Sequence, residues 1–307
     1  MDPRGAGYLA FSGLIVGGLG VAAGVLSAAG VSPFSQTFWR FLLTAVIFVT
    51  VSLVLYGRET IPGKKEWRIV AVSGGLMMVA SLTYIGAISL GVAVPVVSFL
   101  SQLSTIFTVL LAVPLLHEAL TRAKVLVISL GTGGVFFISH PWAAVGGNPE
   151  GELLVLLNAL AFASLTIFNS EFIKHRNYRP QLVSTWMFGG AALWCIPLLV
   201  FGSVQVPSSP ALNEPALLFT MALLLTFVPY SLMNLGLKRV GAGPASILLL
   251  LSSLTSVVLS YFILDEEVGV FSGIGSALIV LSVVILAFSE DRGTRRGSPP
   301  QEARPAG

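Results

Sequence analysis

One basic residue, Arg40, interrupts a long apolar stretch of the sequence, about one turn from the start of the helix predicted over residues 36–56. A charge inside a hydrocarbon layer is unfavourable by a few kcal/mol on insertion scales, so it usually has a partner or a path to water. The guanidinium of Arg40 could bind the carboxylate or phosphate of a small solute. It could equally extend toward the membrane surface or donate to carbonyls of a neighbouring helix. Arg40 is therefore a candidate solute anchor with a structural alternative.

Uncharged polar side chains recur at helical spacing in two other apolar stretches. Ser98, Gln102 and Thr105 follow one another at intervals of four and three residues, and Ser252 and Ser256 do so later in the chain. Such intervals place the side chains on one face of a helix. In lipid, a polar face either holds helices together or borders water. The similar placing of the two sets favours a cavity for a polar solute. Further candidate solute-binding residues, with amide or phenol groups, are Tyr84, Asn158, Asn169, Tyr230 and Asn234.

Pro229 lies within another apolar stretch and removes a backbone hydrogen bond there. A helix broken near mid-membrane is a known pointer to a binding site. It is also a common kink without a functional role, and the sequence does not decide between the two.

The composition of the chain indicates that these polar residues belong to a membrane protein. Of the 307 residues, 55% are hydrophobic and only 10% are charged, whereas soluble domains are nearer a quarter charged. A helix needs about 20 apolar residues to cross a bilayer. The long runs lack the alternation that is typical of barrel strands, so we predict an all-α integral membrane protein. Its ten predicted transmembrane helices cover residues 8–29, 36–56, 68–90, 94–116, 122–140, 152–173, 181–201, 215–237, 243–263 and 269–289.

The distribution of basic residues gives the predicted helices an orientation. With the N-terminus in the cytoplasm and alternating spans, all of the 17 Lys and Arg residues except Arg40 lie in cytoplasmic segments. The outer loops carry acids instead, among them Glu150, Glu214 and Asp265. This sorting follows the positive-inside bias. It predicts a multi-pass protein of the plasma (inner) membrane of a prokaryote with both termini cytoplasmic, and residues 290–307 as a disordered tail.

The second half of the chain repeats the first. Pro33 recurs 147 residues later as Pro180, and Pro95 recurs 149 residues later as Pro244. Pro95 and Pro244 are each expected to open a helix, because proline is favoured in a first helical turn. Five spans per unit is an odd number, so the second unit enters the membrane from the opposite side and the repeat is inverted. The predicted five-helix repeats are residues 8–140 and 152–289.

Three segments, 38–43 (FWRFLL), 86–121 and 236–268, carry a resemblance to a known family. In both halves a link of small residues precedes a helix that opens with Pro and closes with Glu. This pattern resembles the drug/metabolite transporter (DMT) superfamily, in particular the EamA-domain family with ten helices arranged five plus five. His117 and Ala119 stand where that family often has Gly and Pro. The resemblance implies transport of amino acids, other metabolites or drugs, and a central cavity lined by the first, third and fourth helices of each repeat.

We therefore expect a secondary transporter for small metabolites, which works by alternating access at a midplane cavity and in the direction of export. A channel-like facilitator stays open as an alternative. An enzyme is disfavoured, because a lipid-diphosphate enzyme needs clustered acids for Mg²⁺ and the chain has only Asp2, Asp265 and Asp291 as Asp. We expect no cofactor, metal or nucleic acid. The expected partners are the solute and the lipid bilayer, with the protein a monomer or weak homodimer. No carboxylate is predicted at mid-membrane, which favours weak or no coupling through a buried acid.

Overall fold

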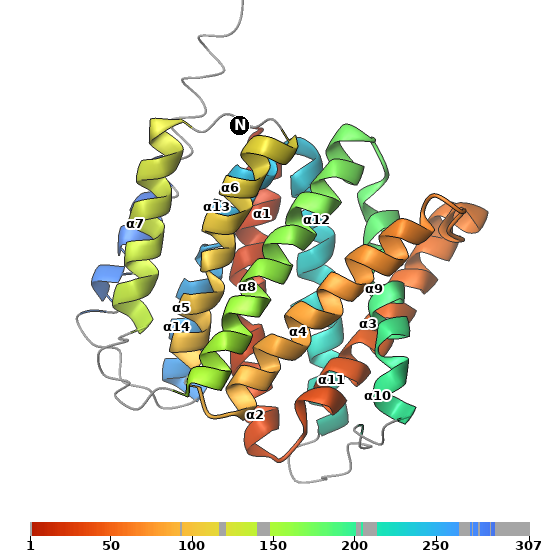
Figure 1. The fold of residues 1–307 in the computed structure, drawn as a ribbon, viewed down its shortest axis with the longest axis horizontal. Coiled ribbons are helices and arrows are strands. Elements are labelled where there is room, and N and C mark those ends of the chain that lie inside the picture. Colours follow the sequence, from red (N-terminus) through yellow and green to blue (C-terminus); the bar gives the residue numbers. More distant parts are fainter. Residues whose placement is uncertain are drawn as a thin grey trace, which may run out of the picture.

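All described residues in helical elements belong to one bundle (Figure 1). In the part of the chain that the structure describes, seven helices are long and apolar enough to cross a bilayer. The other predicted spans correspond to shorter apolar helices, so the count of ten stays a prediction. The family motif at 117–120, the acids at 265–267 and the tail at 290–307 lie outside the described residues. The computed structural model describes residues 2–92, 94–116, 121–139, 148–200, 204, 214–263, 271, 273–275, 277–282 and 284–285.

In the first half of the chain, the first and fourth spans are each interrupted once. The first span is interrupted at Gly17, between α1 and α2. The third begins as a π-helix, η2, and continues as α4. The elements are α1 (Pro3–Val16), α2 (Gly18–Ala28), α3 (Pro33–Tyr56), the 3₁₀ turn η1 (Gly57–Thr60), η2 (Ile69–Ser73), α4 (Gly74–Ser89), α5 (Val94–Ser101), α6 (Leu103–Leu116) and α7 (Arg122–Ser139).

The second half has the same order, with further π-helical turns, η3 and η4. The last described stretches between residues 271 and 285 are helical as well. The elements are α8 (Pro149–Ser170), η3 (Glu171–His175), α9 (Pro180–Trp194), α10 (Ile196–Val200), α11 (Glu214–Ala222), η4 (Leu223–Phe227), α12 (Val228–Arg239), α13 (Ala242–Leu248) and α14 (Leu251–Ile263).

Three of the described spans start at an N-cap residue whose side chain caps the helix and which proline follows directly. The side-chain oxygens of Asp2, Ser32 and Asn148 each accept a hydrogen bond from a backbone N–H two or three residues further on. These bonds satisfy donors that a helix start leaves unpaired. Pro95 and Pro244 lie in the first turns of α5 and α13, as predicted.

Two spans are broken at corresponding points of the repeat. Gln102 separates α5 from α6, and Leu249 and Leu250 separate α13 from α14. Gln102 and Leu250 are 148 residues apart, which matches the sequence offset between the repeats. Discontinuous helices in corresponding halves are a feature of transporter folds.

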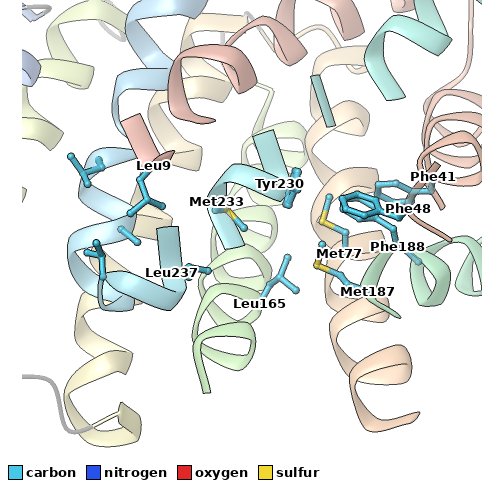
Figure 2. Close-up of a cluster of buried hydrophobic side chains, with 14 of the residues drawn as sticks. Leu9, Phe41, Phe48, Met77, Leu165, Met187, Phe188, Tyr230, Met233 and Leu237 are labelled. Atoms are coloured by element: carbon cyan, nitrogen blue, oxygen red, sulfur yellow. The ribbon is translucent and has the colours of Figure 1, made fainter. Parts of the chain in front are cut away.

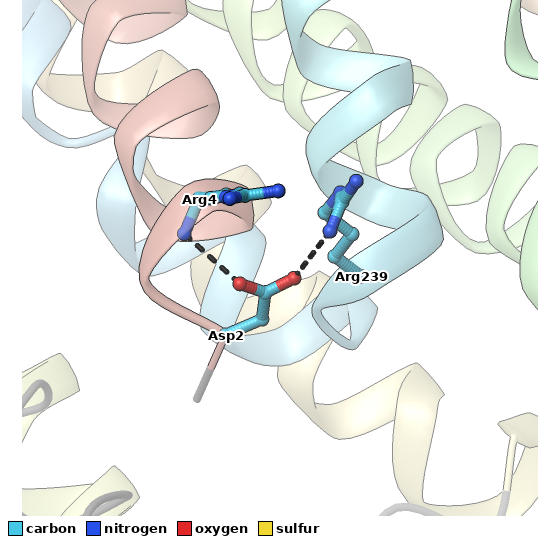
Figure 3. Close-up of polar contacts among 3 residues, drawn as sticks. All are labelled: Asp2, Arg4 and Arg239. Carbon is cyan, nitrogen blue, oxygen red and sulfur yellow. Dashed lines mark hydrogen bonds and ion pairs between the residues drawn. The ribbon is translucent and has the colours of Figure 1, made fainter.

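Helices of the two repeats pack against each other in reciprocal pairs. The first span of one repeat packs on the third span of the other, α1 along α12 and α8 along α4, and α3 packs on α9 (Figure 1). Arg239 at the end of α12 forms an ion pair with Asp2, with Nη1 2.8 Å from Oδ2 (Figure 3). At the opposite end of the bundle, Asn148 Nδ2 donates to the Leu90 carbonyl at 2.9 Å. The chain thus enters the repeats from opposite ends, so the fold is an inverted repeat.

Aromatic rings fill the core between α3, α9 and α12 (Figure 2). The rings of Phe48 and Phe188 stack with centroids 5.1 Å apart, and Tyr230 meets Phe188 edge-on, also at 5.1 Å. The outside of the bundle is apolar too: Val54 is 80% and Phe262 73% exposed. Exposed apolar surface on this scale belongs in lipid.

Glycines allow α9 to cross the start of α4 with the two backbones in contact. A Cβ at Gly190 would lie 1.9 Å from the Val70 carbonyl oxygen, and one at Gly74 would lie 2.5 Å from the Gly190 carbonyl carbon. Small residues permit such close approach between helices in membranes. The contact fixes the position of α4, which carries part of the site described next.

Candidate functional site

A cavity of about 150 Å³ lies between the two repeats. Its walls come from the first, third and fourth spans of each repeat, with one side chain added from α3. Hydroxyl, amide and phenol groups alternate there with apolar side chains. Of the residues predicted to bind solute, the cavity is lined by Arg40, Tyr84, Ser98, Gln102, Thr105, Asn158, Tyr230, Ser252 and Ser256.

Arg40 is the one charged side chain among the described residues that line this cavity. It is 1% exposed. The helix α3 begins at Pro33, so Arg40 lies two turns, about 10 Å, inside its end, deeper than the single turn expected from the sequence. Its Nη2 donates to Ser81 Oγ, and its Nε has no hydrogen-bond partner in the described part of the chain. The guanidinium carbon lies 4.7 Å from the Phe41 ring centroid.

One face of α4 presents Ala80, Ser81 and Tyr84 to the cavity. Their spacing is that of neighbours on one helix face. Tyr84 on α4 and Ser98 on α5 both line the cavity. Asn158 Nδ2 on α8 donates to the Ala80 carbonyl at 2.7 Å. This wall is therefore built from both repeats.

The broken spans face each other across the cavity through their polar side chains. Gln102 Nε2 donates to Ser252 Oγ at 3.2 Å and to Ser253 Oγ at 2.9 Å. The hydroxyl oxygens of Ser98 and Ser256 are 3.5 Å apart. These residues thus join the two spans and also line the cavity.

Backbone carbonyls near the helix irregularities accept hydrogen bonds from cavity hydroxyls. Ser12 Oγ donates to the Pro229 carbonyl at 2.8 Å, and Thr105 Oγ1 donates to the Ser246 carbonyl at 3.3 Å. Pro229 lies two residues after the end of the π-helix η4, so the backbone is irregular next to the place where the sequence suggested a break. The carbonyl oxygens are thus satisfied within the protein.

Asn169 and Asn234 lie outside the cavity. Asn169 Oδ1 accepts a hydrogen bond from Ser73 Oγ at 2.7 Å, and Asn234 Nδ2 donates to Ser184 Oγ at 2.7 Å. Both asparagines are fully buried between helices. They connect neighbouring helices instead of bordering the cavity.

Ser12 and Ser81 line the cavity although the sequence did not single them out. Each is a lone hydroxyl in an apolar helix, and a serine can bond its own helix without any further role. The interval of three residues between Ser81 and Tyr84 was the available signal. Ser12 had no such neighbour.

Two inverted helical repeats around a polar cavity define a multi-pass membrane transporter. The sequence profile of the EamA-like transporter family matches residues 3–140 and 149–288. The chain belongs to the EamA-like transporter family, within the drug/metabolite transporters that the sequence resembles.

Relatives over most of the chain are also transporters. The S-adenosylmethionine uptake transporter of Rickettsia conorii is 27% identical, with 86% of this chain and 85% of the relative covered. The uncharacterized transporter YyaM of Bacillus subtilis is 24% identical, with 82% of this chain and 84% of the relative covered. A solved crystal structure described simply as a protein superposes with a TM-score of 0.76 at 18% identity, over 94% of this chain and 98% of its own. That similarity concerns the fold alone.

Proposed function

We propose that this protein is a secondary transporter that moves small metabolites across the plasma membrane of a prokaryote. Its solutes are amino acids or related polar and amphipathic compounds, drugs among them, and the direction is export. The cavity between the repeats carries this proposal. Each repeat contributes the same spans to it, so rocking of one repeat against the other would expose it to the two sides in turn.

The proposed orientation has the N-terminus and C-terminus in the cytoplasm, and the protein acts as a monomer or weak homodimer. Arg239 pairs with Asp2, and Arg179 Nη1 lies 3.1 Å from Glu59 Oε2. These basic groups belong to the segments assigned to the cytoplasm, where positive charge is favoured.

Flux into proteoliposomes tests the proposal. Amino acids are tested first, followed by S-adenosylmethionine, because the relative from Rickettsia conorii is named as its uptake transporter. Flux is measured in both directions. Saturation and stimulation by solute on the opposite side are expected of a carrier. Flux that stays linear with concentration, without such stimulation, would identify a channel-like facilitator instead.

Three variants test the assignment of the cavity. Gln102→Ala, Asn158→Ala and Tyr230→Ala each remove a polar group from a different wall. At least one is expected to change the half-saturating solute concentration. Unchanged transport in all three would show that solute does not pass through this cavity.

None of the described residues that line the cavity is an acid or a histidine. We therefore propose transport that is not coupled to protons through a buried acid. A strong proton-driven flux that a single mid-helix substitution abolishes would contradict this part of the proposal.

A further inference from the structure

We propose that Arg40 binds the carboxylate of the transported solute, and that the cavity takes small monocarboxylates in preference to cations or phosphates. The inference deepens the proposed transport function and rests on it. Arg40 is almost completely buried and lines the cavity. Burial of a charge is unfavourable unless the charge is paired and hydrogen-bonded. A partner for this guanidinium is therefore required.

The described part of the protein does not supply that partner. The side chains within electrostatic range of Arg40 are the phenols of Tyr230 and Tyr84 and the thiol of Cys195. These groups are uncharged at neutral pH in their ordinary forms. The ion pairs resolved among the described residues lie at helix ends and are Arg176 with Glu171, Arg179 with Glu59 and Arg239 with Asp2.

The hydrogen bonds of Arg40 are also incomplete. A guanidinium carries five N–H donors, yet Ser81 is the single side-chain acceptor among the described residues, and Nε has no partner. A carboxylate can accept two parallel N–H bonds from an arginine. Tyr84, one turn further along α4 than Ser81, also lines the cavity and carries a hydroxyl.

The count of charges selects a monocarboxylate. The lining contains one positive charge and no negative one among its described residues. A monocarboxylate neutralises that charge, whereas a phosphate monoester carries about −1.5 to −2 near pH 7 and leaves an excess. An ammonium group would add a second positive charge to a buried site. Because like charges repel strongly where water is excluded, cationic amines that lack a carboxylate are disfavoured.

The rest of the wall suits a small apolar group. Met77, Met233 and Phe162 line the cavity beside the polar residues. Methionine adapts its shape to different apolar partners. A volume of about 150 Å³ is that of a cavity able to hold benzene. A short branched or aromatic monocarboxylate fits this description.

Binding to the purified wild-type protein in detergent tests the charge preference. The probes are valine, its 2-oxo acid, the methyl ester of that acid, isobutylamine and isobutyl phosphate, which share a branched carbon skeleton. Titration calorimetry is expected to rank the 2-oxo acid first and valine below it. The ester and the amine are expected to bind at least about tenfold more weakly, equivalent to 1.4 kcal/mol.

Variants of α3 test the anchor itself. Removal of one partner of a buried charge pair weakens binding strongly, so Arg40→Gln should bind the 2-oxo acid at least about thirtyfold more weakly. Arg40→Lys keeps the positive charge, so its affinity for the 2-oxo acid should lie between those of the wild type and Arg40→Gln. Thr44→Val is the matched control, because Thr44 lies one turn away and donates to the Ala222 carbonyl at 3.3 Å, outside the cavity. Its affinity should equal that of the wild type.

Thermal unfolding without ligand distinguishes a solute-binding role of Arg40 from a structural one. If Arg40 binds solute, Arg40→Met should unfold at the wild-type temperature or above it, because it removes a buried, incompletely paired charge. It should also lose the stabilisation that the 2-oxo acid gives the wild type. A large fall in unfolding temperature with unchanged carboxylate affinity in Arg40→Lys and Arg40→Gln would assign Arg40 to structure.

The remaining outcomes are decisive as well. Equal binding of the ester or amine and the 2-oxo acid overturns the proposal, and so does the absence of binding by the 2-oxo acid. Tighter binding of isobutyl phosphate would assign the site to phosphates instead. Proteoliposome flux reads the transport function independently. If the protein gives saturable flux of a solute and Arg40→Gln does not change that flux, the transport function stands and the role of Arg40 as solute anchor is refuted.

Discussion

Replacement of Gly190 by alanine should destabilise this protein, whereas the same change at the adjacent Gly189 should not. A Cβ at Gly190 would lie 1.9 Å from the Val70 carbonyl oxygen and 2.8 Å from its carbonyl carbon. Both atoms belong to the backbone of η2, so α9 and η2 must move apart to make room. A Cβ at Gly189 meets no heavy atom within 4 Å.

The magnitude follows from two opposing effects. Alanine favours a helix over glycine by about 1 kcal/mol at both positions. Overpacking of a close contact is unfavourable by about 1–3 kcal/mol or somewhat more, and here it also separates Val70 from Trp186 and Val183. The propensity gain is common to both variants and cancels, so their free energies of unfolding should differ by about 1–3 kcal/mol, with Gly190→Ala the less stable.

Cys195 supplies the assay. It is the one cysteine of the chain and is completely buried, so a thiol-reactive fluorogenic dye reports unfolding. The melting temperatures of Gly189→Ala and Gly190→Ala are compared with the wild type in one detergent, with tryptophan fluorescence as a second probe. Equal melting of the two variants would refute the close backbone contact.

Three further predictions concern contacts between the spans. In a cysteine-free background, Ser98→Cys with Ser256→Cys should form a disulfide, because the native hydroxyls are 3.5 Å apart, and should stop transport until it is reduced; unaffected flux would argue against movement at this contact. Asn234→Leu should lower the free energy of unfolding by about 1 kcal/mol, because the buried Ser184 hydroxyl loses the amide donor from α12 and keeps only its own bond to the Pro180 carbonyl; unchanged melting would contradict this. The Arg239 guanidinium holds the pKa of Asp2 below its ordinary value of 3.8, so the ion pair should persist above pH 3.8 and be lost as pH falls through the lowered pKa. Amide exchange in the first turn of α1 should then accelerate at acidic pH, and a rate independent of pH after correction for intrinsic exchange would exclude this role.

Much of the helical arrangement could be predicted, because long apolar runs and sorted charges are local signals. Pro95 and Pro244 marked helix starts correctly, since proline suits a first turn. The breaks at Gln102 and Leu250 were not foreseen. Neither site has a proline or glycine at the break, and the geometry depends on the partner span.

The candidate site was predictable in its residue types and less so in its geometry. Helical spacing shows which side chains share a face, but it does not show which neighbour that face meets. Asn158 and Asn169 lie on the same helix, yet Asn158 reaches the cavity and Asn169 contacts Ser73. Arg40 proved deeper than expected because α3 begins at Pro33.

The packing of helices from one repeat against helices of the other has a consequence for biosynthesis. Both α1 and α4 are made before α12 and α8, the helices they pack against, have been translated. The first half therefore enters the membrane before the helices that cover its inner surfaces exist. At that stage Arg40 lacks the neighbouring side chains that the second half contributes to the cavity. The bundle closes only after the late helices insert. A chain that stops midway would leave the Arg40 guanidinium and the polar side chains of the cavity wall exposed to lipid.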